Sequence, residues 1–214
     1  HAKAMIDLSI HMKNFVSTAN PLLSSLRNVA TRTARRTPGL REFLSEAKFK
    51  PRPRYEAGAY FGLPRQRRNG LEGEQLPQPT LADRECQPLL LDEALGEGYA
   101  LIGFAVDPRQ SLSAADLQQL AQLNTRYLTL YPAGGRPQGK AAASTPAGLS
   151  EWEDMSGECI RRFREAGYAE GAVAIVRPDR FVFAMARPGN APAAVQSLLE
   201  QLGLQTATRQ QEAS

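Results

Sequence analysis

The sequence predicts a domain of the α/β class, in which helices cover both faces of a mixed β-sheet. The main observation is the stretch 173–186, where two short segments are apolar at successive positions and not only at alternate ones. Strands of that kind lie inside a sheet whose two faces are both covered. The Pro178-Asp179 pair between the segments predicts a hairpin turn, because proline presets φ and aspartate bonds back to the backbone. The second observation is the alternation of strand and helix patterns along residues 89–203.

The composition is that of a globular protein. Its 214 residues, 42% of them hydrophobic, suffice for one or two domains with a core. No run approaches the ~18 apolar residues of a membrane span, so we expect no membrane partner. Cys86 and Cys159 lie too far apart for a metal clip or a disulfide framework. These features favour a reducing, cytoplasmic location.

An amphipathic helix is expected at the start of the chain. Its apolar residues recur at spacings of three and four, which makes one apolar stripe. No capping residue precedes this helix and the first residue is His1, so we expect a piece of a longer protein whose stripe faced a missing part. The alternative is a trimmed terminus, with the stripe packed on the chain's own core. The stripe consists of Met5, Leu8, Met12 and Phe15.

The charge of the chain is uneven. Residues 27–68 contain twelve lysines and arginines against three acids, whereas residues 69–214 carry a net charge of −6. Within and before the basic part, Asn20 is expected to cap a helix that begins at Pro21, and Pro38 to open another. The split in charge indicates two parts of different character.

Four segments follow from these patterns. Residues 1–56 are expected to be a helical, basic tail of a truncated FAD-binding and substrate domain, an assignment that depends on the resemblance described below. Residues 57–80, rich in Gly, Pro and Arg, are expected to be a linker. Residues 81–205 are expected to be the α/β domain, and residues 206–214 a disordered tail.

Apolar segments in the α/β part predict its strands. Residues 89–91 are expected to be a short strand, followed by a turn at 92–96. Residues 99–105 and 126–131 are expected to be two parallel strands, joined by a right-handed crossover. Residues 132–149 are expected to be a long loop of Gly, Pro, Ala and Ser.

Capping residues predict three helices, two between these strands and one after the hairpin. Ser113 with Asp116 is expected to begin the first, and Ser150 with Glu153 the second. Asn190 is expected to cap the last. Leu112 and Leu117 are expected to staple the first helix; Trp152, Met155, Cys159 and Phe163 to lie along the second; and Leu198, Leu199 and Leu202 to lie inside the third, which Gly203 ends.

The resulting order is strand, helix, strand, helix, strand, strand, helix, which is the order of the thioredoxin fold. A thioredoxin needs Cys-x-x-Cys at the start of its first helix. Here the corresponding junction, residues 105–111, has no cysteine, and residues 167–173 have no proline where a cis-proline would stand. We therefore expect a redox-inactive domain with no CxxC, in which Cys159 is a buried structural residue.

Other motifs point to no chemistry. The stretch Gly134–Lys140 is close to a P-loop, but Ala141 replaces the magnesium-binding hydroxyl and Pro146 replaces a helix. The Gly96-Glu-Gly98 turn precedes a strand and does not follow one, so it cannot act as a dinucleotide loop. His1 and His11 lie on different sides of a helix and form no metal pair.

The basic part could bind nucleic acid through phosphates, since aromatic residues are interleaved with the arginines. However, its prolines interrupt any single helical stripe, and it contains no recognised nucleic-acid motif. We therefore expect no nucleic-acid partner. The aromatic residues in question are Phe43, Phe49, Tyr55, Tyr60 and Phe61.

Several short segments, in order along the chain, resemble class A flavoprotein aromatic hydroxylases. Residues 1–9 are similar to the helix that closes the FAD domain in that family. The sequence Arg177-Pro-Asp-Arg-Phe-Val182 is similar to its C-terminal part. Between these two, the similar positions are Phe49-Lys-Pro51, Tyr55, Gly58, Gln78-Pro79, Leu91-Asp92, Gly96 and Ile102-Gly103.

The resemblance implies a parent protein that uses FAD, NADH or NADPH, and molecular oxygen. Such an enzyme hydroxylates a phenolic acid, for example 3-(3-hydroxyphenyl)propionate, beside its existing hydroxyl in aromatic catabolism. The family's C-terminal end is a thioredoxin-like domain without redox cysteines. The implied partners are a missing N-terminal FAD domain of the same polypeptide, the phenolic acid, and a second copy in a homodimer.

The flavin motifs of the family, Gly-x-Gly-x-x-Gly and a later Gly-Asp, are absent from this sequence. We therefore assign no catalytic, cofactor-binding or metal-binding residue. We expect the chain alone to be structural and inactive, with no cofactor bound. The alternative is a self-standing, redox-inactive thioredoxin-like interaction module with a basic arm.

Overall fold

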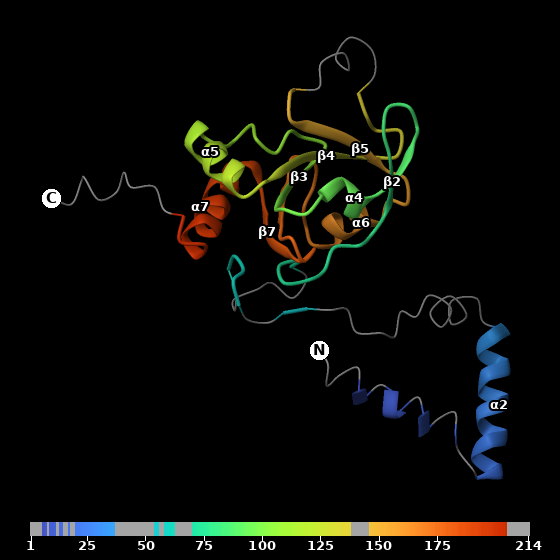
Figure 1. Ribbon diagram of the computed structural model, residues 1–214. Coiled ribbons are helices and arrows are strands. Elements are labelled where there is room, and N and C mark those ends of the chain that lie inside the picture. The colour runs from blue at the N-terminus through green and yellow to red at the C-terminus, as the bar shows by residue number, and fades with distance from the viewer. Residues whose placement is uncertain are drawn as a thin grey trace. The chain divides into compact units, whose positions relative to one another are not determined.

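A computed structural model gives the fold (Figure 1). It describes residues 6–7, 9–11, 13–14, 17, 20–36, 54–55, 58–62, 70–137 and 146–204. Contacts between Cα atoms divide the chain into two compact units, His1–Arg54 and Tyr55–Ser214.

Helix α2 (Pro21–Arg36) belongs to the first unit. The Leu22 amide donates to Oδ1 of Asn20 at 3.0 Å, and Pro21 opens the helix, so the predicted cap is confirmed. Apolar side chains of α2 are exposed: Leu22, Leu23, Leu26 and Val29. The predicted stripe at Met5, Leu8, Met12 and Phe15 and the helix predicted at Pro38 lie outside the described residues.

A seven-stranded mixed sheet forms the centre of the second unit (Figure 1). In chain order its strands are β1 (Thr80–Ala82), β2 (Pro88–Leu90), β3 (Ala100–Phe104), β4 (Arg126–Pro132), β5 (Leu149–Asp154), β6 (Val173–Val176) and β7 (Val182–Ala186). Their spatial order is β2-β1-β5-β4-β3-β6-β7. Strand β4 pairs in parallel with both β3 and β5, and the other neighbours are antiparallel.

Helices cover both faces of the sheet, as the sequence predicts. Residues of α4 and α6 pack in a core cluster on one face, and residues of α5 and α7 pack in a second cluster on the other. A single 3-10 turn, Pro188–Asn190, leads into α7. The bounds are α4 (Leu91–Leu95), α5 (Ala114–Gln122), α6 (Glu158–Glu165) and α7 (Ala191–Gln201).

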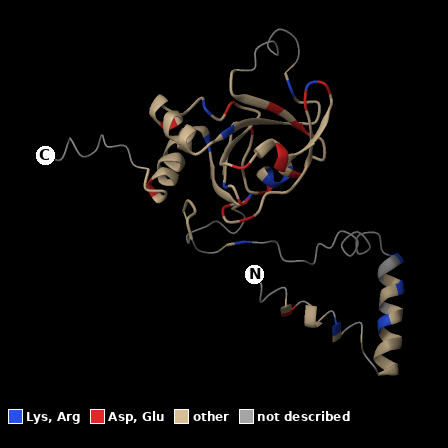
Figure 2. Ribbon diagram, viewed as in Figure 1, with Lys and Arg blue, Asp and Glu red and all other residues tan. Residues whose placement is uncertain are grey.

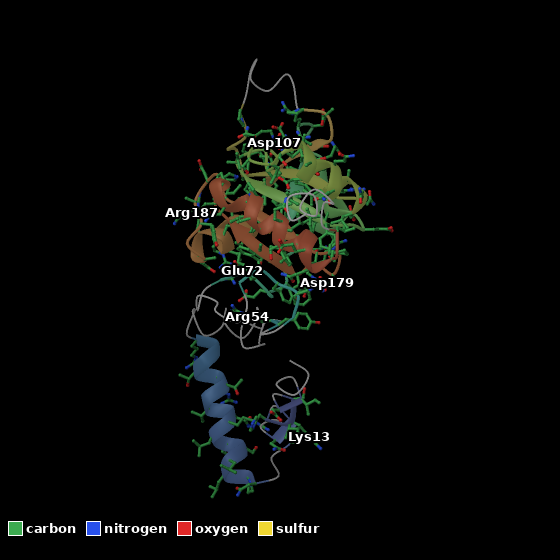
Figure 3. All side chains as sticks on the ribbon, turned by 90° about the vertical axis from the view of Figure 1, so that its left-hand side faces the viewer. Lys13, Arg54, Glu72, Asp107, Asp179 and Arg187 are labelled. Carbon is green, nitrogen blue, oxygen red and sulfur yellow. The ribbon has the colours of Figure 1, made fainter. Side chains whose placement is uncertain are left out.

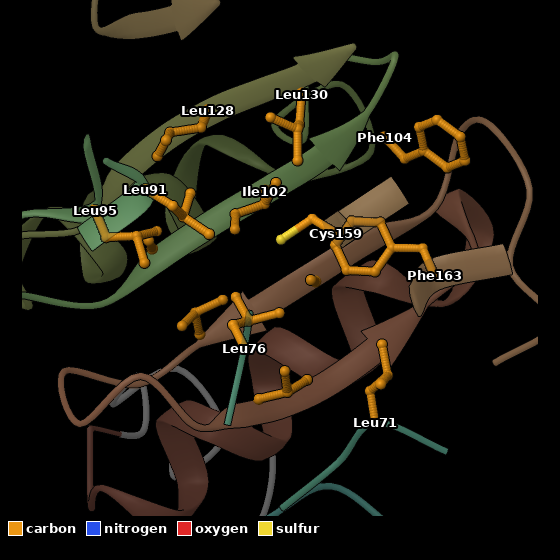
Figure 4. Close-up of a cluster of buried hydrophobic side chains, with 14 of the residues drawn as sticks. Leu71, Leu76, Leu91, Leu95, Ile102, Phe104, Leu128, Leu130, Cys159 and Phe163 are labelled. Atoms are coloured by element: carbon orange, nitrogen blue, oxygen red, sulfur yellow. The ribbon is translucent and has the colours of Figure 1, made fainter. Parts of the chain in front are cut away.

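The predicted doubly covered hairpin is confirmed, because every residue of β6 and β7 is buried. Strand β3, which lies beside β6, is buried along its whole length as well. On one face, Cys159 and Phe163 of α6 lie against the side of the sheet that carries Ile102 and Leu128 (Figure 4). The centre of the sheet is therefore the core of the domain.

The thioredoxin-like fold is present in the order β3-α5-β4-α6-β6-β7-α7. Its four strands lie as β4-β3-β6-β7, with β3 and β4 parallel and the last pair antiparallel, as predicted. Strands β5, β1 and β2 extend the sheet beyond β4. The capping box of α5 is also confirmed: the Ser113 hydroxyl accepts the Asp116 amide at 3.1 Å, and the Asp116 carboxylate accepts the Ser113 amide at 3.1 Å.

The helix predicted to begin at Ser150 is wrong at its start. Residues Leu149–Asp154 form β5, and α6 begins after it. Ser150 and Glu153 have the spacing of a capping box, but parallel pairing with β4 satisfies the backbone of this stretch instead. Gly157 is the N-cap residue of α6, and Asp154, three residues before it, supplies the acceptor: its Oδ2 accepts the Ile160 amide at 3.1 Å.

Two smaller expectations are corrected as well. The stretch 92–96, expected to be a turn, lies mostly in α4, whose Leu91 and Leu95 bury their side chains in the core. Leu202, expected inside, is 40% exposed because it lies at the C-cap of α7.

Gly203 ends α7 as predicted. Its φ is +71°, which is the left-handed conformation that favours glycine. The Gly203 amide donates to the Glu200 carbonyl at 3.1 Å, and the Leu204 amide donates to the Leu199 carbonyl at 2.8 Å. These two bonds form a Schellman motif.

Part of the stretch 57–80, expected to be a linker, packs on the sheet. Leu71 is 2% exposed and Leu76 is 8% exposed, and both belong to the core cluster of α4 and α6. Strand β1 begins at Thr80. The domain limits drawn from the sequence stay predictions.

None of the helices in the described part of the chain is long and apolar enough to cross a membrane.

Candidate functional site

The corner between β3 and α5 is the place where a thioredoxin fold carries its reactive cysteines. Here the chain folds tightly back at this corner. The Val106 carbonyl lies over Gly103, where an added β-carbon would stand 1.9 Å from the oxygen. Ala105 has a φ of +54°, and the buried Thr129 hydroxyl donates to the Val106 carbonyl at 3.0 Å. The corner is therefore a closed loop, and Thr129 of β4 fixes it through this hydrogen bond.

An ion pair fills this corner. Arg109 donates through Nε and Nη2 to both oxygens of Asp107, with a shortest distance of 2.8 Å. The two side chains are only 18% and 16% exposed. Figure 3 marks the position of Asp107. Such a two-pronged pair is rigid as well as strong.

Arg109 also ties the corner to its surroundings. Its Nη1 donates to the Ala147 carbonyl at 2.8 Å, just before β5, and its guanidinium lies 5.5 Å from the centre of the Tyr127 ring. Burial acts to raise the pKa of Asp107, but the hydrogen bonds and charge of Arg109 outweigh it and hold that pKa below its ordinary value. Hydrogen bonding to Asp107 in turn raises the pKa of Arg109.

Chemically, this arrangement positions a loop and supplies no nucleophile. In the sequence, the junction 105–111 is notable only for its lack of cysteine, and the ion pair inside it was not predicted. The signal that could have found the pair is an arginine directly after an Asp-Pro, shortly after the end of an apolar strand.

Cys159 is buried, as predicted. Its side chain is 0% exposed, and its thiol lies 3.8 Å from the Pro77 carbonyl. Burial raises the pKa of the Cys159 thiol well above its ordinary value, and the charges of Asp154 and Glu158 add to this effect. A thiol of that kind stays protonated and unreactive.

The loop that is close to a P-loop already holds a carboxylate of the chain itself. The Gly134 and Arg136 amides donate to the two oxygens of Glu153, at 3.1 and 3.3 Å. Arg136 is almost wholly buried and donates to the Ala82 carbonyl at 2.7 Å. These donors are directed at Glu153 and not at a phosphate, which supports the interpretation of this stretch as a surface loop. Residues 138–145 lie outside the described part of the chain.

Residues quoted for the family resemblance, far apart in the sequence, come together at the tip of the β6–β7 hairpin. The Arg177 guanidinium lies 4.8 Å from the centre of the Tyr60 ring and donates to the Ala59 carbonyl at 3.2 Å. The rings of Tyr55 and Phe181 lie 4.7 Å apart. Tyr55, Ala59 and Tyr60 thus contact the hairpin.

Asp179 is a turn residue, as predicted. Its Oδ1 accepts the Phe181 amide at 3.3 Å, and its Oδ2 lies 2.9 Å from Nη2 of Arg177. The Arg180 amide donates to the Arg177 carbonyl at 2.9 Å, which closes the turn.

A cavity of about 340 Å³ lies beside the end of β7. Figure 3 marks two of its charged residues, Glu72 and Arg187.

Across the described residues, no group of three or more His, Cys, Asp or Glu side chains could hold a metal ion. Charged residues are spread over the second unit in both signs (Figure 2).

The described residues do not fit a flavin. Arg109 fills the corner after β3, Glu153 takes the amides of the loop after β4, and no glycine-rich turn there leads from a strand into a helix. No catalytic step through a flavin can be assigned to these side chains.

Comparison with known families supplies the classification. A family model described as the HcaD C-terminal domain matches residues 73–201. The chain belongs to the HcaD C-terminal domain family.

Curated relatives of this HcaD C-terminal domain protein are hydroxylases. A 3-(3-hydroxy-phenyl)propionate/3-hydroxycinnamic acid hydroxylase of Klebsiella pneumoniae (strain 342) is 28% identical over 208 residues, which are 96% of this chain and 36% of the relative. A hydroxylase of the same name from Mycobacterium sp. (strain JLS) is 35% identical over 132 residues, 62% of this chain and 23% of the relative. The resemblance to aromatic hydroxylases is confirmed, and the chain spans about a third or less of these relatives' length.

Two solved structures show distant similarity. The flavin-dependent monooxygenase PieE, solved with FAD and substrate, is 16% identical with a TM-score of 0.48, over 95% of this chain and 36% of that chain. Yeast Sco1 is 11% identical with a TM-score of 0.45, over 62% of this chain and 96% of that chain. The strand order described above is what establishes the fold of this domain.

Proposed function

We propose that this chain is the C-terminal part of an FAD- and NAD(P)H-dependent monooxygenase. The enzyme hydroxylates a phenolic acid, such as 3-(3-hydroxyphenyl)propionate, beside its existing hydroxyl, in aromatic catabolism in the cytoplasm. The observation that carries this proposal is the match to a curated hydroxylase over 96% of the chain. FAD, held by the rest of the polypeptide, supplies the redox chemistry.

Within that enzyme, this part acts as a scaffold and carries no reacting group. The closed corner at Arg109 and Asp107 supports this role, because the position that serves chemistry in thioredoxins holds a partly buried ion pair. The buried thiol of Cys159 supports it as well.

The first unit is proposed to contact the FAD-binding part of the same polypeptide. Helix α2 exposes Leu22, Leu26 and Val29, at 76%, 68% and 63%. Exposed apolar residues on one helix are typical of a surface that a partner covers. The proposal assigns that partner to the larger part of the relatives' length to which this chain has no counterpart.

The test compares the 214-residue chain with the natural reading frame that contains it. We expect the longer protein to bind FAD and to oxidise NADH or NADPH with a hydroxyphenylpropionate. We expect the 214-residue chain to retain no yellow FAD once the unbound FAD is removed, and to show no oxidation of NADH or NADPH. Tight yellow binding by the chain alone would overturn the scaffold role. A natural reading frame limited to these residues would favour the self-standing interaction module.

A further inference from the structure

Strand β7 is the last strand of the sheet in spatial order. Its residues Val182–Ala186 are all buried and apolar. A long apolar strand at a sheet edge offers unpaired N–H and C=O groups to another chain, and proteins protect such edges. The structure contains a protecting segment, residues 70–76, which we name the edge strap.

Backbone hydrogen bonds join the edge strap to β7 and the turn before it. The Gly73 amide donates to the Val182 carbonyl, and the Val182 amide donates to the Glu74 carbonyl, both at 2.9 Å. The Leu76 amide donates to the Arg180 carbonyl at 3.0 Å, and Gln75 forms a bridge with Phe181. The strap therefore pairs with Val182, the first residue of β7, and with the turn before it, as a short antiparallel strand would.

Side chains fix the strap in this place. Leu71 and Leu76 are buried in the core cluster of α4 and α6. Glu74 lies 2.5 Å from Nη2 of Arg162 on α6, and both side chains are 13% exposed. Glu72 accepts the Met185 amide at 3.3 Å. The strap is thus bound by apolar, ionic and backbone contacts together.

Gly73 makes this close packing geometrically feasible. Its φ is +75°, and a β-carbon there would stand 2.3 Å from the Tyr55 carbonyl oxygen. The Tyr55 amide donates to the Gly73 carbonyl at 2.8 Å. A larger residue at position 73 would therefore push the strap away from the sheet or from Tyr55.

We propose that the edge strap blocks pairing of a second copy with β7, and that release of the strap lets β7 bind the strap of a second copy of this chain. The second copy is the fitting occupant because its residues 73–76 would repeat the same backbone bonds. Its Leu71 and Leu76 would refill the same two core positions. Exchange of one element between identical chains creates a dimer without any new contact surface. This inference does not depend on the proposed enzymatic function.

The test uses the full chain with Gly73→Val, and Gly157→Val as the matched control. Gly157 has a φ of +67° with nothing within 4 Å of an added β-carbon, so it imposes similar backbone strain without a clash. For Gly73→Val we expect the Val182 amide to exchange with solvent about 100-fold faster in dilute solution. We also expect a dimer that grows with protein concentration in light scattering, whereas the control stays monomeric.

A cysteine pair distinguishes strap exchange from other association. Gln75→Cys with Phe181→Cys joins the strap to the hairpin across their bridge, in a Cys86→Ser background. On the wild-type strap we expect an intramolecular disulfide in a monomer. With Gly73→Val added at high concentration, we expect a disulfide-linked dimer. A Gly73→Val protein that exposes the Val182 amide yet stays monomeric would overturn the proposal, as would a dimer without the 75–181 link.

A milder variant covers the case in which Gly73→Val does not fold. Glu74→Gln with Arg162→Gln removes the ion pair and leaves the backbone unchanged. We expect a smaller increase in Val182 exchange and a weaker dimer in this variant. An unchanged Val182 exchange rate would contradict the role given to the strap's side-chain anchors.

Discussion

The Val106 carbonyl oxygen lies directly over Gly103, 1.9 Å from the point where a β-carbon would stand. Gly103 lies in the buried central strand β3, and Val106 lies in the loop that leaves it. Because the obstacle is backbone and not the end of a side chain, only glycine allows this fold-back. The shape of the corner thus depends on one hydrogen atom in the place of a side chain.

Replacing Gly103 by alanine is expected to destabilise the domain by about 3 kcal/mol, since overpacking a rigid core forces the backbone to move. The measurement is urea unfolding followed by the fluorescence of Trp152, the single tryptophan of the chain. Gly189→Ala is the control, because an added β-carbon there has no neighbour within 4 Å. Equal unfolding midpoints for the two variants would show that the corner relaxes freely.

The Asp107–Arg109 pair should stabilise the domain in a pH-dependent way. The folded-state pKa of Asp107 is lowered, so its contribution is fully present above the unfolded pKa of about 3.9 and is lost as the pH falls through the folded value. At pH 7 we expect Asp107→Asn to reduce the free energy of unfolding by about 2 kcal/mol.

That difference should shrink toward zero as the pH is lowered below about 4. Chemical denaturation of wild type and Asp107→Asn across this range provides the measurement. The double variant Asp107→Asn with Arg109→Met is the control, because it removes both charges of the pair. A constant difference at every pH would mean that the substituted asparagine side chain destabilises the domain through its packing and not through the loss of charge.

The buried leucine of the edge strap should matter to the whole domain. Leu71→Ala is expected to cost about 2–5 kcal/mol, as truncation of a buried leucine does. Leu90→Ala, on the 43% exposed Leu90 of β2, is the control and should cost far less. If both substitutions had the same small effect on thermal unfolding, residues 57–80 would behave as the linker that the sequence predicts.

The two cysteines should differ sharply toward a thiol reagent. Cys86 is exposed and should react at once, whereas Cys159 is buried with a raised pKa and should react only after unfolding. A colorimetric thiol count in native buffer and in urea measures this. Two rapidly reacting thiols in native buffer would contradict the packing of α6 on the sheet.

The centre of the fold could be predicted because its signals are local. The hairpin at Pro178-Asp179 is apolar on both faces, and Ser113 with Asp116 and Gly203 mark helix ends by their own hydrogen bonds. These features depend on residues within a few positions of one another. Sequence patterns therefore gave the order of the central strands and helices.

The edges of the fold could not be predicted because long-range pairing decides them. Ser150 and Glu153 have the spacing of a helix cap, yet pairing with β4 makes this stretch a strand. Glu153 then accepts the Gly134 and Arg136 amides, and α6 begins after Gly157, with Asp154 accepting the Ile160 amide. The Arg109–Asp107 pair was overlooked because its burial depends on Tyr127 and Ala147, which only the fold brings near.

Neither border of this sheet offers a long bare strand. At one side β2 is three residues long and begins with Pro88, which has no amide hydrogen to donate. At the other side residues 73–76 pair with Val182, the first residue of β7, and with the turn before it. Because another chain finds little unpaired backbone at either border, we expect this domain to have little tendency to polymerise into fibrils.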